Sequence, residues 1–123
     1  MNVLLATMDM SLARMICPRI VNRGHLAIMA NSVKEADELI RRHQVNLAII
    51  CLQLPDGNPL ALIEKIKQYN PATPIVVMTA TNTRSLELSI RKLGITYYMV
   101  APISVEEIES ILVYLSARST ITD

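Results

Sequence analysis

The chain has 123 residues, of which 51% are hydrophobic and 19% charged, with twelve Lys and Arg against eleven Asp and Glu. This length predicts one domain, residues 1–123, and the even charge argues against binding to nucleic acid or to an anionic membrane. No apolar run reaches the length of a membrane span and no secretory signal opens the chain, so we expect a cytoplasmic protein.

Short apolar runs alternate with amphipathic segments along the whole chain. In chain order they predict strand 3–6, helix 11–23, strand 26–30, helix 33–42, strand 47–52, helix 59–69, strand 75–79, helix 84–93, strand 97–100 and helix 105–116. Gly24 and Gly94 suit the left-handed residue that ends a helix. Ser32 with Glu35 forms a capping box that opens the second helix, and Asn58 before a proline suits the start of the third.

Five strands that alternate with five helices predict an α/β protein of (βα)5 order. Such alternation requires right-handed crossovers and a parallel sheet with helices on both of its faces. Ligands and chemistry then lie at the carboxyl ends of the strands. The candidate functional positions are therefore the residues that follow strands, at 7–9, 51–52, 79–80 and 101–102.

Several motifs occur in a specific order: a continuous apolar strand at 47–52, Leu-Pro-Asp-Gly at 54–57, Thr-Ala at 79–80 after a second buried strand, and a proline in the final loop. In this order the chain resembles the response-regulator receiver domain of bacterial two-component signalling, over nearly its whole length. The resemblance implies a flavodoxin-like fold and a place in phosphorelay signal transduction. It also implies a cis peptide bond before Pro102.

In that family, an aspartate at a strand end accepts a phosphoryl group, an acidic pair holds Mg²⁺, a Thr or Ser bonds the phosphoryl group, and a Lys before a proline neutralises it. Carried over by position, the aspartate falls on Cys51, the acidic pair on Thr7 and Met8 with Asp9 one residue further, and the lysine on Ala101 before Pro102. Of these groups, Thr79 alone matches. We therefore predict a degenerate receiver, a pseudo-receiver, with no metal, no cofactor and no catalytic residue of its own.

The resemblance also assigns a conformational role to Tyr98, because the family has an aromatic residue there that moves together with the Thr at position 79. The face formed by the fourth helix, the last strand and the fifth helix commonly carries partner contacts or dimers. In this chain that candidate interface consists of Arg84, Glu87, Arg91, Lys92, Tyr98, Glu106 and Tyr114. Its mixed charges and tyrosines suit a modest interface with a signalling protein, an output domain or a second copy, and they suit an ordinary solvated face equally.

Four hypotheses about function remain open at this point. The leading one is a phosphorylation-independent protein-interaction module. The first alternative is a thiol-based redox regulator that uses Cys51, although a small buried cysteine is more often a packing residue; another is a receiver that still takes part in the phosphorelay. An enzyme is the weakest hypothesis, because no glycine-rich phosphate loop or cluster of carboxylates appears.

Overall fold

The computed structural model describes residues 1–122, with side chains described to residue 117. Its elements are β1 (Asn2–Ala6), α1 (Met10–Asn22), β2 (Leu26–Ala30), α2 (Val33–Arg42), β3 (Leu47–Cys51), α3 (Pro59–Tyr69), β4 (Ile75–Thr79), α4 (Arg84–Arg91), β5 (Tyr97–Val100) and α5 (Val105–Thr122). The predicted order of strands and helices is confirmed. The main differences are that α4 ends two residues earlier than predicted and α5 continues to Thr122.

The five strands form one parallel sheet in the order β2-β1-β3-β4-β5. β3 lies at its centre, so the carboxyl ends of β1 and β4 flank Cys51 on either side. In register, Ala6 lies opposite Ile50, and Cys51 lies opposite Met78. The predicted α/β fold is therefore confirmed, and its topology gathers the candidate positions at one edge of the sheet.

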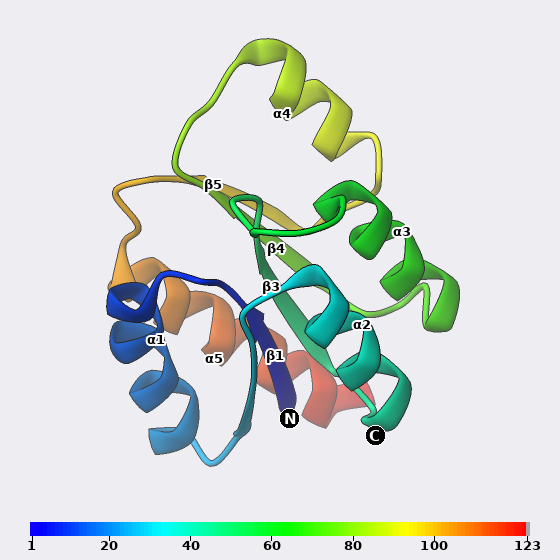
Figure 1. Ribbon diagram of the computed structural model, residues 1–123. Coiled ribbons are helices and arrows are strands. Elements are labelled where there is room, and N and C mark those ends of the chain that lie inside the picture. Colours follow the sequence, from blue (N-terminus) through cyan, green and yellow to red (C-terminus); the bar gives the residue numbers. More distant parts are fainter. Residues whose placement is uncertain (123) are drawn as a thin grey trace.

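Helices cover both faces of the sheet: α1 and α5 lie on one face, and α2, α3 and α4 on the other (Figure 1). Every residue of β3 and of β4 is buried, which explains why these strands are continuous apolar runs. Alternate residues of β3 face opposite helices. Leu47, Ile49 and Cys51 pack on the side of α1 and α5, whereas Ala48 and Ile50 pack on the side of α2 and α3.

The loop between β3 and α3 is anchored to the start of α2. The Asp56 carboxylate accepts hydrogen bonds from the backbone N–H groups of Val33 (2.8 Å) and Lys34 (3.2 Å). Gly57 has φ +65°, and a Cβ atom there would lie 3.2 Å from the Val33 side chain. Asn58 caps α3 by accepting a bond from the Leu60 N–H group (3.0 Å). Residues 54–57 therefore form a turn that is docked against α2, and we call this segment the docked turn.

Across the part of the chain that the structure describes, we find no helix with the combined length and apolar character of a transmembrane segment.

Candidate functional site

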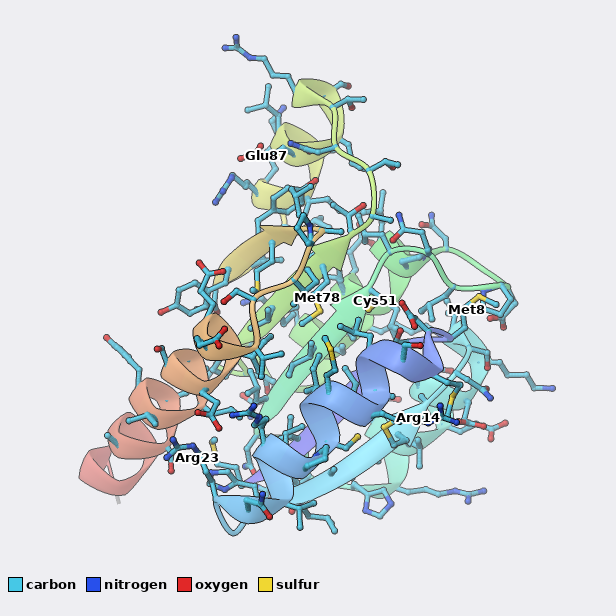
Figure 2. All side chains as sticks on the ribbon, turned by 90° about the vertical axis from the view of Figure 1, so that its left-hand side faces the viewer. Met8, Arg14, Arg23, Cys51, Met78 and Glu87 are labelled. Carbon is cyan, nitrogen blue, oxygen red and sulfur yellow. The ribbon has the colours of Figure 1, made fainter. Side chains whose placement is uncertain are left out.

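The carboxyl ends of β1, β3, β4 and β5 surround a cavity of about 380 Å³ next to the first turns of α1. This rim cavity is lined mainly by apolar side chains, among them Met8, Leu12, Met15, Cys51, Met78 and Ile103. Figure 2 shows Cys51 and Met78 beside one another on neighbouring strands, with Met8 near the start of α1. Asp9 is the single charged residue among the described residues that line the cavity.

Cys51 ends β3 and is 6% exposed. Burial raises the pKa of its thiol, and the nearby Asp9 carboxylate raises it further, whereas a hydrogen bond with the Thr7 side chain acts in the opposite direction. The thiol is therefore held in its protonated form at neutral pH. A protonated, buried thiol is a poor nucleophile and a poor metal ligand.

The segment where the resemblance places the acidic pair carries one carboxylate, that of Asp9. Thr7 is buried, and its hydroxyl accepts a hydrogen bond from the Asp9 N–H group (3.0 Å). Met8 is 52% exposed. The Asp9 side chain accepts a bond from the Leu12 N–H group (3.1 Å), which makes it the N-cap of α1. No group of three or more His, Cys, Asp or Glu residues that could hold a metal ion occurs among the described residues.

Thr79 is buried at the end of β4, and the side chain of Gln53 covers it. The Gln53 amide nitrogen donates to the Thr79 hydroxyl oxygen (3.0 Å), and its carbonyl oxygen accepts a bond from the Ala80 N–H group (3.0 Å). The Thr79 hydroxyl in turn donates to the Thr81 carbonyl oxygen (2.6 Å). Gln53 thus spans the rim and engages the hydroxyl that the family pattern assigns to a phosphoryl group.

Ala101 follows β5, and its N–H group donates to the Thr79 carbonyl oxygen (2.9 Å). The peptide bond between Ala101 and Pro102 is cis, which confirms the prediction. Both residues line the rim cavity. The methyl group of Ala101 brings no positive charge to the position where the family pattern has a lysine.

Tyr98 lies away from the rim cavity, half-buried between β5 and α4. Its hydroxyl donates to the Asn82 Oδ1 atom (2.7 Å), and the Arg91 guanidinium lies 5.5 Å from the centre of its ring. Arg91 also pairs with Glu87, with 2.8 Å between Nε and Oε2. Partial burial and the Glu87 carboxylate raise the pKa of the Tyr98 hydroxyl.

The structure brings part of the candidate interface together. Glu87, Arg91 and Tyr98 form one cluster, and Tyr98 shares a hollow beside β5 and α5 with Tyr114. Glu106 and Tyr114 border a second hollow on α5. The other two members, Arg84 and Lys92, are exposed at the two ends of α4.

Sequence analysis did not identify Gln53, Met15 or Asn82 as site residues. Gln53 contacts Thr79, which is 26 residues away, and Asn82 contacts Tyr98 across 16 residues. One signal was present for Gln53, because it lies two residues beyond the end of β3, at the edge where parallel sheets carry their sites. Met15 lies on α1 at helical spacing from Leu12, a pattern that usually indicates a core residue.

Comparison with known proteins gives one family. The family model for the response regulator receiver domain matches residues 4–113. The transcriptional regulatory protein PhoP of Escherichia coli (strain K12) is 28% identical over 120 residues, which cover 98% of this chain and 54% of PhoP. The response regulator protein PilR of Pseudomonas aeruginosa is 30% identical over 83 residues, covering 68% of this chain and 19% of PilR. The chain therefore spans about half the length of PhoP and less of PilR.

Solved structures agree with this result. The non-phosphorylated receiver domain of HemR from Leptospira biflexa superposes with a TM-score of 0.84 at 25% identity, over 93% of this chain and 92% of that one. A CheY-like response regulator receiver domain protein from Methanospirillum hungatei JF-1 gives a TM-score of 0.86 at 19% identity, over 97% and 96% of the two chains. At that lower identity, the second match supports the fold alone.

Proposed function

This chain belongs to the response-regulator receiver family of signal transduction, and we propose that within it the chain is a pseudo-receiver, a cytoplasmic interaction module whose output does not depend on aspartyl phosphorylation. The observation that carries this proposal is that a buried cysteine, Cys51, occupies the strand end where the family has its phosphate acceptor. Family members of this kind act as signalling modules and not as classical enzymes.

The charges around the rim cavity support the proposal. Phosphoryl transfer requires a nucleophile together with cations that stabilise the charge of the transition state. This chain has Met8 and Ala101 at the positions of a metal ligand and of the lysine, and the Asp9 side chain caps α1. An incoming phosphate would therefore meet an apolar surface and one negative charge.

The contacts of Gln53 support the same proposal. Its amide already forms hydrogen bonds with both the Thr79 hydroxyl and the Ala80 N–H group. A phosphoryl oxygen could bind to these groups only by displacing Gln53. A ligand or partner that favours one arrangement of these residues would change the module by differential binding, without covalent chemistry. We propose that the partner surface consists of the exposed groups of α4, β5 and α5, and that it binds a signalling protein or a second copy of the chain.

A phosphorylation assay tests the proposal. The protein is incubated with acetyl phosphate and Mg²⁺, and its intact mass is measured. We expect no mass gain of one phosphoryl group. The matched variant Thr7→Asp/Met8→Asp/Cys51→Asp/Ala101→Lys restores the acceptor, the acidic pair and the lysine, and we expect it to gain the group. Stable incorporation of phosphate into the unmodified chain would overturn the proposal.

Thiol reactivity separates this proposal from redox regulation through Cys51. Because burial and Asp9 raise the pKa of Cys51, we expect its alkylation rate to rise steeply with pH beyond neutral values and to remain below that of the half-buried Cys17. Cys51→Val and Cys17→Ser variants assign the two rates. A Cys51 thiol that reacts rapidly at neutral pH would favour the redox regulator instead.

A further inference from the structure

The rim cavity has the properties of a binding site for a small molecule. We infer that it binds a small apolar molecule that carries no negative charge. Its volume of about 380 Å³ falls within the range of roughly 300–1,000 Å³ that is typical of ligand sites. The inference rests on the shape and lining of the cavity, and it holds or fails independently of whether the chain can be phosphorylated.

The lining of the cavity has buried side chains on the sheet and more exposed, flexible side chains at its opening. Met78 and Cys51 are buried at the ends of β4 and β3, where the sheet holds them in register. Met8 and Met15 are 52% and 44% exposed on the side of α1. Thioether side chains are flexible and polarisable, so they adapt to ligands of varied shape. Scattered exposed methionines need no explanation, but here two of them border one apolar cavity.

The polar groups of the cavity indicate the charge of the ligand. Asp9 is the one charged side chain among the described lining residues, and no cationic side chain accompanies it. An anion would be repelled by this carboxylate and would lose its hydration against an apolar wall. A neutral molecule incurs neither cost. Gln53 and Thr79 offer amide and hydroxyl groups to a ligand with one polar atom.

Two fluorescent probes with the same aromatic body and different charge test this inference. N-phenyl-1-naphthylamine is neutral, whereas 1-anilinonaphthalene-8-sulfonate carries a sulfonate. We expect the unmodified chain to bind the neutral probe more tightly than the sulfonate, in the absence of Mg²⁺ and of any phosphate donor. Failure to bind the neutral probe, or equal affinity for both probes, would overturn the inference. Phosphorylation is measured separately by mass, so failure of the probe to bind would not count against the proposed pseudo-receiver function.

A substitution that fills the cavity tests whether the probe binds there. Ala101 lines the cavity and is exposed, so Ala101→Leu places an isobutyl group in it at little cost to folding. We expect this variant to bind the neutral probe about tenfold more weakly or not at all. The matched control is Ala61→Leu on the exposed side of α3, outside the cavity, and it should bind normally. Equal loss in both variants, or in neither, would contradict binding at this site.

Two further measurements test the lining residues directly. Asp9→Asn preserves an N-cap but removes the charge, so we expect the sulfonate to bind about two- to fivefold more tightly while the neutral probe is unchanged. In chains labelled at the methionine methyl groups, the neutral probe should shift the NMR signals of Met8, Met15 and Met78, whereas Met29, which packs against Cys17, should not move. An unchanged sulfonate affinity, or shifts spread over all the methionines, would contradict the inference.

Discussion

Two neighbouring regions of this molecule have diverged from the family pattern to different degrees. The docked turn at residues 54–57 keeps the motif Leu-Pro-Asp-Gly, and its Asp56 carboxylate bonds two N–H groups of α2. The rim cavity, which begins only a few residues earlier, has a thiol, a methionine and an alanine where the family has groups that handle a phosphate.

The difference separates the residues that build the scaffold from those that perform its chemistry. Asp56 satisfies backbone donors that no other side chain reaches in the described structure, so its removal affects folding. Met8, Cys51 and Ala101 bring no charge to the cavity, so these positions need neither a bound cation nor an ion pair to offset one. On our proposal, this chain keeps the fold of a receiver without the groups that react with a phosphate.

The largest effect should come from returning a carboxylate to the rim. We expect Cys51→Asp alone to lower the free energy of unfolding by about 2–3 kcal/mol, because it buries an acidic group without a cation. Burial and Asp9 would raise the pKa of the new carboxyl group, so its folded form retains a proton that the unfolded form loses. Stability should therefore fall as the pH rises through the ordinary pKa of an aspartate towards the raised one.

Urea unfolding of Cys51→Asp at several pH values checks this expectation, and Cys51→Val is the control that fills the same space without charge. If the aspartate variant were as stable as the valine variant at neutral pH, the rim would still be able to accommodate a negative charge. The contrast between the two regions would then disappear.

Removal of the aspartate from the docked turn should have the next largest effect. Asp56→Ala loses both bonds to α2, and we expect a loss of about 1–2 kcal/mol in the free energy of unfolding. Asp56→Asn retains one acceptor oxygen and should lose less. Chemical denaturation of the three proteins measures the difference, and an alanine variant as stable as the original would show that the turn is not a scaffold element.

The smallest effect is expected on the surface formed by α4 and β5. Tyr98→Phe removes the hydroxyl that donates to Asn82 and should cost about 0.5–1 kcal/mol. Tyr97→Phe, one residue earlier on the same strand, has a more exposed ring and is the control. Thermal unfolding of the two variants sharpens the comparison by showing whether Tyr98 contributes to the scaffold. An equal effect of both substitutions would argue that the bond to Asn82 contributes nothing.

Local sequence signals predicted most of the fold. Asn58 before Pro59, and Ser32 three residues before Glu35, marked helix starts that the structure confirms, because caps depend on neighbours within one turn. The location of the rim cavity was predictable, because strand order and parallel pairing bring Cys51 and Thr79 to the same edge of the sheet. The resemblance to the family indicated which groups were replaced there.

The contacts within the rim were not predictable from the sequence. The sequence marks Asp9 as a carboxylate near the strand end, but its use as the N-cap of α1 depends on where that helix begins. The bonds of Gln53 join loops from β3 and β4, so they exist only after the sheet has formed. The apolar character of the cavity also arises from residues on β3, β4, α1 and the loops that follow β1, β4 and β5, and no short window of sequence contains all of them.

The close approach of Gly57 to Val33 has a mechanical consequence. A Cβ atom on residue 57 would lie only 3.2 Å from the Val33 side chain, and the positive φ of this residue disfavours any side chain as well. A larger residue at position 57 would therefore push the loop after β3 away from the first turn of α2 and would stretch the two hydrogen bonds of Asp56.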